Sequence, residues 1–307
     1  MSLPKAKFTI TIATKNRLSE LKYTLKKIAY LIEREDVMCI LCDDGSTDGT
    51  FQYIVENYPK INVLRNANSK GIHASRNKLL NKVTTPYILS IDDDAHFISD
   101  HVLETVEAYF KQHPKAALLS FRAFWDKEKP SSTDTIKKAK RVQGFGAVGF
   151  AMRTEAWKAI PNFLEWFVFY GEEDFAAFQL FKKGLEIHYL PEVLVHHRVN
   201  LKQRRKHNDY RLRLRRAIRA GWYMYVLFYP WRMQPKLFLY TMFMQLKLKV
   251  FKGDIRAFFA LLQACFDVIY NFPRLLKHSN RFTKEELNAY KNLSKPEYYW
   301  LPENTKK

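Results

Sequence analysis

The sequence predicts an α/β fold in which a doubly wound, mostly parallel sheet is followed by a basic, mainly helical C-terminal extension. Two observations support this prediction. Over the first third of the chain, short apolar runs alternate with amphipathic segments of about 10–15 residues, which is typical of parallel strands joined by helices. After residue 200, strand patterns stop and lysine, arginine and aromatic residues become frequent. We therefore expect an α/β domain at residues 1–200 and an extension at residues 201–307.

Each expected element follows from the spacing of its apolar residues. The expected strands are residues 8–13, 37–42, 61–64, 87–91, 116–121 and 187–195. The expected helices are residues 18–32, 47–57, 71–81, 99–112 and 175–183, the last of them stopped by Gly184. In a doubly wound sheet, ligands bind at the carboxyl ends of the strands. A site is therefore expected among the residues that follow the strands.

The 307 residues have a globular composition, with 47% hydrophobic and 27% charged residues, so the chain can bury a sizeable core. Three cysteines are too few for a disulfide framework and indicate a reducing compartment. Cys39 and Cys42 stand three apart on an expected strand and would point to opposite faces of the sheet. The short polar start does not resemble a secretory signal, and no run of about 18 uncharged apolar residues predicts a membrane-spanning helix. We expect a cytoplasmic protein, with a peripheral position on the inner face of the plasma membrane as the alternative.

Positive charge is concentrated in one part of the chain. The net charge is +20, and residues 198–256 contain 16 lysine or arginine residues against two aspartates. This asymmetry predicts an anionic partner, which could be nucleic acid, an anionic membrane surface or a phosphorylated ligand. Residues 201–229 combine the charge with aromatic residues such as Trp222 and Tyr223, so we expect this segment to contact a membrane interface. The alternative is an ordinary helical subdomain with a solvated basic face.

Polar residues follow several of the expected strands. Asp43 and Asp44 end the second strand, Asp92-Asp93-Asp94 the fourth, and His196-His197 a later one. Each group alone has a plain structural explanation, such as a turn or a helix cap, but their repetition at one edge of a sheet does not. Three adjacent carboxylates repel one another unless a cation or hydrogen-bond donors compensate, and oxygen ligands suit Mg²⁺ or Mn²⁺. An imidazole from His196 would tilt the preference toward Mn²⁺.

A second acidic group precedes the helix expected at residues 175–183. Glu172, Glu173 and Asp174 stand at its amino end, where carboxylates favour the helix dipole, so a structural role is the alternative. The functional interpretation is a general base, because transfer of a group to a hydroxyl needs a carboxylate that accepts the hydroxyl proton. Neighbouring carboxylates raise one another's pKa into the range that such a base requires.

Together these residues resemble family 2 of the glycosyltransferases, the large inverting group with the GT-A fold, and in particular its bacterial cell-surface glycan type. The resemblance covers residues 7–199. Five motifs occur in the family's order. They are residues 12–17 (IATKNR), 43–50 (DDGSTDGT), 71–77 (GIHASRN), 91–95 (IDDDA), and 171–174 (GEED) followed by 190–197 (LPEVLVHH).

The resemblance implies a nucleotide pocket at the ends of the first strands. Ala13, Thr14, Asn16 and Arg17 would line this pocket. Asp44 would accept a hydrogen bond from the base, with Asp43 beside it. Arg76 would reach the nucleotide or its diphosphate.

The resemblance also implies a metal site and a base. Asp94 would be the direct metal ligand, Asp92 would face the ribose or the metal, and Asp93 would lie beside them at the donor. His196 would complete the metal shell, with His197 as the second choice. Asp174 would be the catalytic base, with Glu173 as its rival. On the acceptor side, Trp166 or Tyr170 would stack on a sugar face.

The expected function is the transfer of a sugar from a nucleotide-sugar donor, with UDP as the default nucleotide, to a hydroxyl of a glycan or lipid-linked glycan. It would depend on Mn²⁺ or Mg²⁺ and invert the anomeric centre. One alternative is a sugar nucleotidyltransferase, which would need a glycine-rich phosphate-binding signature that residues 13–17 lack. The other is a basic nucleic-acid-binding protein, which would explain the charge but not the acidic strand ends. We therefore expect no nucleic acid partner.

Overall fold

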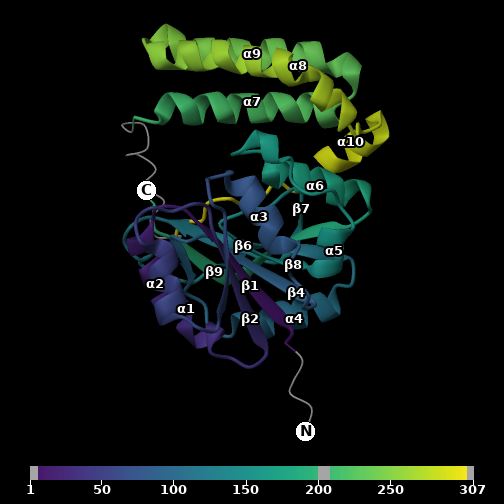
Figure 1. Cartoon of the computed structure of the whole chain (residues 1–307). Helices are drawn as coiled ribbons and strands as arrows, with labels where there is room; N and C mark the ends of the chain where they lie inside the picture. The colour runs from purple at the N-terminus through teal and green to yellow at the C-terminus, as the bar shows by residue number, and fades with distance from the viewer. Residues whose placement is uncertain (1–5, 200–207, 303–307) are drawn as a thin grey trace.

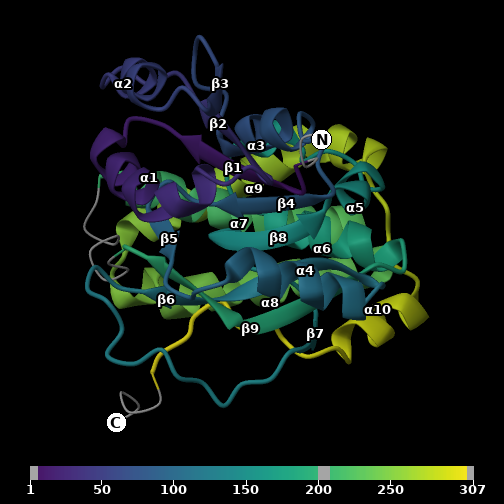
Figure 2. The ribbon, with the colours of Figure 1, turned by 90° about the horizontal axis from the view of Figure 1, so that it is seen from below.

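The computed structural model describes residues 6–199 and 208–302 and places them in a nine-stranded sheet with helices on both faces and a further layer of helices above it (Figure 1). The strand order is β3-β2-β1-β4-β8-β6-β9-β5, and β7 pairs with β9. Seen from below, β3 and β7 lie toward opposite ends of the sheet and α7, α8 and α9 lie behind it (Figure 2). The predicted α/β class, with its mostly parallel sheet and helical C-terminal region, is confirmed.

The first half of the chain forms the parallel part of the sheet. Its strands are β1 (Phe8–Thr14), β2 (Val37–Asp43), β3 (Ile61–Arg65) and β4 (Tyr87–Ile91). Its helices are α1 (Leu18–Ile32), α2 (Thr50–Asn57) and α3 (Ile72–Leu80). Phe8 stands opposite both Val37 and Tyr87, so β1, β2 and β4 run in step. Their carboxyl ends therefore open at one edge, as predicted.

The second half of the sheet is mixed. Its strands are β5 (Ala95–Phe97), β6 (Ala116–Trp125), β7 (Lys140–Val142), β8 (Gly149–Arg153) and β9 (Glu186–His197). Its helices are α4 (Val102–Gln112), α5 (Thr154–Lys158), the 3₁₀ turn at Glu165–Phe167, and α6 (Glu172–Lys182). β8 runs antiparallel between β4 and β6. The short strands β5, β7 and β8 were not predicted. β5 and β7 have three residues each, too few to show periodicity, and β8 begins at Gly149, in a segment rich in glycine.

Strand β6 is longer than the sequence predicts. It was expected to end at residue 121, but it continues through Arg122 to Trp125 alongside β9. Arg122 is only 3% exposed, and its guanidinium lies 4.4 Å from the ring centre of Trp300. The main-chain N–H of Trp300 donates to the carbonyl of Ala123 at 2.8 Å. A contact from the far end of the chain thus holds a charged residue inside a strand.

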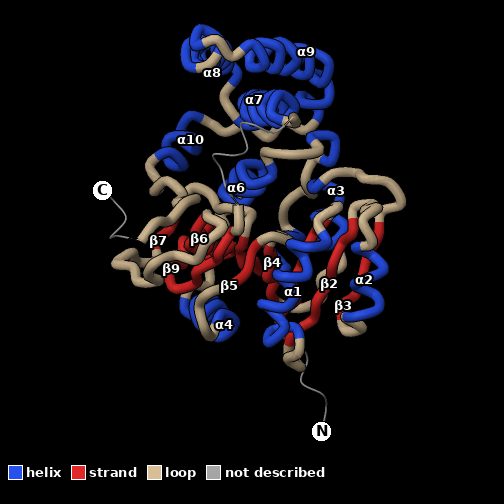
Figure 3. The backbone as a smooth tube through the Cα atoms, turned by 90° about the vertical axis from the view of Figure 1, so that its left-hand side faces the viewer, coloured by secondary structure: helices blue, strands red, loops and turns tan. Residues whose placement is uncertain are grey.

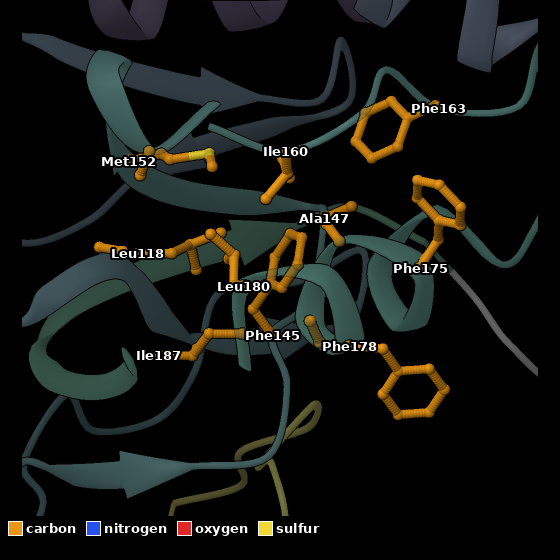
Figure 4. Close-up of a cluster of buried hydrophobic side chains, with 14 of the residues drawn as sticks. Leu118, Phe145, Ala147, Met152, Ile160, Phe163, Phe175, Phe178, Leu180 and Ile187 are labelled. Carbon is orange, nitrogen blue, oxygen red and sulfur yellow. The ribbon is translucent and has the colours of Figure 1, made fainter. Parts of the chain in front are cut away.

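Two large hydrophobic cores lie on the two faces of the sheet. One packs α1 and α4 against β1, β4 and β6. The other joins α5 and α6 to the strands and continues into α7, and Figure 4 shows Leu118, Met152 and Ile187 of the sheet near Leu180 of α6. Cys39 belongs to the first core, whereas Cys42 packs beneath α3 with Ile40 and Leu79. Both thiols are free and buried, as their spacing on β2 predicts.

The C-terminal region consists of α7 (Tyr210–Phe228), α8 (Gln234–Leu248), α9 (Ile255–Lys277) and α10 (Lys284–Lys291), with 3₁₀ turns at Trp231–Met233 and Val250–Lys252. The prediction that residues 201–229 present their aromatic side chains to a membrane is wrong for the described part of that segment. Trp222 and Tyr223 are buried, and Trp222 Nε1 donates to Thr241 of α8. Residues 201–207 and the predicted boundary at residue 200 lie outside the described residues, so the two-domain division stays a prediction.

Candidate active site

A cleft of about 760 Å³ lies at the carboxyl edge of the sheet, beneath α7. Its walls are the end of β1, the turn after β4, the amino end of α6, the end of β9 and part of α7. Small-molecule sites typically enclose roughly 300–1,000 Å³, so the cleft can hold a ligand of nucleotide size. Gly71 (φ +92°), at the amino end of α3, lets the segment around Val168 pack closely beside this cleft, because a Cβ at residue 71 would meet Val168 at 2.8 Å.

The three carboxylates of the turn between β4 and β5, residues 92–94, point in two directions. Asp93 turns back toward β1, where it accepts from Thr14 Oγ1 at 2.7 Å and lies 3.4 Å from Arg17 Nε. Burial raises the pKa of Asp93 to about 7 against the opposing charge of Arg17. Asp92 and Asp94 point instead toward the end of β9. Of the three carboxylates, Asp93 is therefore the one that fastens the turn to the end of β1.

The histidine that joins Asp92 and Asp94 is His197. These three residues offer ligand atoms that all lie within 4.8 Å of one another, and His197 Nε2 is 3.0 Å from Asp94 Oδ1. The expectation that His196 completes this cluster is wrong, because neighbouring residues of a strand point to opposite faces. His196 lies on the other side of β9, where its Nε2 is 2.9 Å from the main-chain oxygen of Asp126.

Two arginines neutralise part of the negative charge of the acidic turn. Arg17 Nη2 lies 2.5 Å from Asp94 Oδ2. Burial alone would raise the pKa of Asp94, but the hydrogen bond and charge of His197, together with Arg17, hold that pKa well below its usual range. Arg76, which is buried, donates to Asp92 at 2.8 Å and to Glu172 at 2.6 Å. Burial raises the pKa of Asp92 even though Arg76 opposes the rise.

The Arg76–Glu172 pair extends to His73, which the sequence did not single out. His73 Nε2 lies 3.0 Å from Glu172 Oε2, and Glu172 is itself buried. Burial would raise the pKa of Glu172, but His73 and Arg76 lower it to about 2. Glu172 therefore stays ionised and anchors the amino end of α6 to α3.

The other two acidic residues of α6 face the cleft with raised pKa values. Glu173 Oε1 accepts a hydrogen bond of 2.6 Å from the main-chain N–H of Ala147, and no described residue hydrogen-bonds its Oε2. Burial and the charge of Glu172 raise the pKa of Glu173 to about 8. The same two causes raise the pKa of Asp174 to about 6, although its side chain opens to the cleft. Both carboxylates can accept a proton near neutral pH.

The predicted nucleotide residues divide into two groups. Ala13, Thr14, Arg17, Arg76 and Asp44 line the cleft. Asn16 and Asp43 do not: they hold the turns beneath it, since Asn16 Oδ1 accepts from Thr47 N at 2.7 Å and Asp43 Oδ1 from Ser46 N at 3.0 Å.

Asp44 has a structural role as well as a place in the cleft. Its carboxylate accepts hydrogen bonds from Asn66, from the Ser69 hydroxyl and from the main-chain N–H groups of Lys70 and Gly71, at 2.6–2.9 Å. Burial would raise the pKa of Asp44, but these hydrogen bonds lower it overall. The carboxylate oxygens of Asp44 therefore hold the 66–71 loop in place. The sequence had predicted that they contact a nucleotide base.

Several lining residues were missed because they come from distant parts of the chain. Arg213 and Arg216 reach the cleft from α7, and Tyr298 and Tyr299 reach it from the C-terminal segment. Burial and the charges of Arg219, Arg215 and Arg213 lower the pKa of Arg216. Tyr170, expected on the acceptor side, lines the cleft, whereas Trp166 packs on Phe167 and Tyr223. The basic composition of residues 198–256 was the available signal for the arginines.

Known structures share this fold. The mannosyltransferase PcManGT from Pyrobaculum calidifontis, in complex with GDP-Man and Mn²⁺, is 14% identical with a TM-score of 0.52, and the match covers 93% of this chain and 78% of that one. GalNAc-T7 with UDP, GalNAc and Mn²⁺ is 13% identical with a TM-score of 0.53, covering 72% and 50%. S. aureus TarS 1-349 in complex with UDP-GlcNAc is 18% identical with a TM-score of 0.50, covering 68% of this chain and 64%, or less than two thirds, of that one.

The fold and the acidic cleft define an α/β protein with a GT-A-like architecture. The family model for Glycosyl transferase family 2 matches residues 9–177, which is more than half of the chain. The chain therefore belongs to glycosyl transferase family 2. No match was found among curated protein sequences.

Proposed function

We propose that this glycosyltransferase moves a sugar from a UDP-sugar donor to a hydroxyl of a bacterial cell-surface glycan or its lipid-linked precursor. The transfer inverts the anomeric centre of the sugar. The observation that supports this most directly is the single cleft that combines a three-ligand acidic cluster with two carboxylates of raised pKa. The solved structures with this fold carry UDP, UDP-GlcNAc or GDP-Man in their descriptions.

The residues around Asp94 fit a divalent cation. Two carboxylates and one imidazole form a hard donor set that suits Mn²⁺ or Mg²⁺. Nδ1 of His197 is buried and has no hydrogen-bond partner among the described residues. Asp92, Asp94 and His197 would hold the cation, which supplies positive charge to the leaving diphosphate. Arg17, which is half exposed beside Asp94, adds a second positive charge on the same side of the cleft.

The base is one of the two carboxylates of α6 that have raised pKa values, Glu173 or Asp174. Asp174 was the first choice from the sequence, but the contacts favour Glu173. Ala147 donates to Glu173 through its N–H, and the carbonyl of Ala147 accepts from Arg76 at 3.3 Å, which in turn holds Asp92. Glu173 is therefore linked to the acidic cluster through Ala147 and Arg76, with Oε1 oriented by a main-chain donor. Burial raises the pKa values of Tyr290 and Tyr298, and the charge of Asp174 adds to both shifts, so Asp174 lies toward the C-terminal segment.

Inversion needs one such base and no enzymic nucleophile. The acceptor hydroxyl attacks the anomeric carbon, the bond to the diphosphate breaks, and the hydroxyl proton passes to the carboxylate. A base with a pKa near the working pH is the most effective for this transfer.

A thermal-shift screen of nucleotide sugars, with and without Mn²⁺, tests the proposal. A ligand that binds only the folded state raises the melting temperature by mass action. We expect stabilisation by a UDP-sugar that requires Mn²⁺, followed by release of UDP when a matching acceptor is supplied. Stabilisation by a nucleoside triphosphate together with a sugar phosphate, but by no nucleotide sugar, would instead point to a nucleotidyltransferase.

A further inference from the structure

Helix α9 buries mostly small and polar residues and directs most of its large apolar residues away from the protein. The buried side contains Ala257, Ala260, Ala264, Asp267 and Asn271, with Leu261 and Leu275 as its large apolar members. The opposite side carries Ile255, Phe259, Leu262, Phe266 and Ile269, spaced by three or four residues and 41–70% exposed. In water, burial of apolar area favours the reverse arrangement. The outer side of α9 is therefore built for an apolar environment.

Helix α8 enlarges this surface. Within this fully described helix no residue is buried, and Leu239, Tyr240 and Phe243 are each more than half exposed. Figures 1 and 3 show α8 and α9 together as the outermost layer, separated from the sheet by α7. We call these three residues and the five of α9 the outer apolar face. A contiguous exposed patch of this kind marks an interaction site.

The charges around the outer apolar face have one sign. Residues 234–277 contain seven lysines or arginines, two aspartates and no glutamate. Neither aspartate is free to balance the positive charges. Asp267 is buried on the inner side of α9. Asp254 accepts hydrogen bonds from Ala257 N at the start of α9 and from Tyr210 Oη. Lys236, Lys247 and Arg274 are exposed. Apolar side chains bordered by lysine and arginine complement an anionic lipid surface.

We propose that the outer apolar face docks on an anionic membrane, with α8 and α9 lying in the headgroup region. The cleft, which Arg213 and Arg216 of α7 line from above, then lies about one helix layer, roughly 10 Å, from the lipid. This inference does not rest on the proposed reaction. It differs from the surface that the sequence indicated, because Trp222, Tyr223 and Phe228 of α7 are buried, whereas no aromatic residue of α8 or α9 is buried.

The contacts of α9 favour surface docking over crossing of the bilayer. Among the described helices, α9 alone is long and apolar enough to span a membrane by length and composition. However, Asp267 pairs with Arg215 at 2.5 Å and with Arg219 at 3.5 Å, both on α7. Asn271 donates to Tyr223 Oη at 2.9 Å. Spanning would strip a carboxylate and an amide of these partners inside hydrocarbon, which is costly.

Co-sedimentation of the full chain with vesicles tests the proposal. The vesicles contain phosphatidylcholine alone or phosphatidylcholine with phosphatidylglycerol. We expect binding that requires phosphatidylglycerol and weakens with salt. The double variant Phe266→Gln/Ile269→Gln should bind at least about tenfold less, because each large side chain contributes on the order of tenfold when buried. Arg274→Gln/Lys277→Gln should bind several-fold less to the anionic vesicles.

A matched control is Tyr30→Gln/Val55→Gln, which removes half-exposed apolar residues from α1 and α2 and should bind like the parent chain. All variants should keep the melting temperature and donor-dependent thermal shift of the parent, so a failure of membrane binding is distinguishable from a failure of the proposed function.

Three results would overturn the proposal. The first is equal vesicle binding by the apolar variant and its control, or no binding by the parent chain. The second is a dimer without lipid that the apolar variant dissociates, which would assign the face to a second copy. The third is retention of the membrane-bound protein after alkaline carbonate extraction, which would indicate a spanning helix.

Discussion

On the sheet side of the cleft, Asp94 lies against His197 and Arg17, whereas on the α6 side Glu173 has a main-chain N–H and the negative charge of Glu172 as its neighbours. Both carboxylates are largely removed from water. The pKa of Asp94 falls below its usual range, while that of Glu173 rises to about 8. Burial acts in the same direction on both, so the neighbouring charges decide the difference. One side is prepared to hold a cation and the other to accept a proton.

The largest effect is expected from Asp94→Ala. The change removes a proposed cation ligand and leaves Arg17 without its partner, so sugar transfer should fall by about a thousandfold or more. The Mn²⁺-dependent thermal shift with a UDP-sugar should disappear as well. Asp93→Asn is the matched control, because Asp93 faces Thr14 and not the cluster. Equal losses in the two variants would show that the turn acts only as a structural unit.

The next largest effect separates the two carboxylates of α6. Glu173→Gln should lower kcat by about 10²–10⁴-fold, which is the usual contribution of a general base, while donor binding is retained. Asp174→Asn should cost much less. The measurements are steady-state rates and the donor-dependent thermal shift for each variant. The opposite ranking would return the role of base to Asp174.

A smaller effect distinguishes the two adjacent histidines at the end of β9, His196 and His197. His197→Ala should weaken the Mn²⁺ dependence of donor binding by about a hundredfold, as losses around metal sites commonly do. His196→Ala should leave it unchanged, because that ring lies on the far side of the strand beside Asp126. Titration of Mn²⁺ in the thermal-shift assay provides the comparison. A larger loss in the His196 variant would contradict the geometry of the cluster.

The mildest test uses pH. A base acts only when ionised, so kcat/KM should fall about tenfold for each pH unit below its pKa. This fall in kcat/KM should begin near pH 8 if Glu173 is the base and near pH 6 if Asp174 is the base. Substitution of the residue that acts as base should abolish this pH dependence, and substitution of the other carboxylate should leave it unchanged.

Much of this site was readable from local sequence. Asp44, Asp92 and Asp94 follow apolar runs that form parallel strands, and the ends of such strands meet at one edge. The choice between His196 and His197 was not readable in this way. Alternation along β9 shows that only one of them faces the cluster, but which one depends on how the strand is set against β5 and β6.

The C-terminal helices show the same limit on a larger scale. Aromatic residues occur throughout residues 208–277, and their pattern alone does not say which are covered. Tyr223 of α7 is buried against Trp166 and Phe167, whereas Trp222 is buried between α7, α8 and α9. The alanines of α9 pack on α7 and leave Phe259 and Phe266 outside.

The sequence by itself determined the α/β class, the glycosyltransferase family motifs and the acidic residues of the cleft, because each depends on spacing within a short segment. Only the tertiary structure decided that His197 joins Asp94, that Glu172 is held by His73 and Arg76, and that α8 and α9 expose the outer apolar face. The physical reason is that pKa values and burial depend on all neighbouring groups. At this site, those neighbours come from segments about a hundred residues apart.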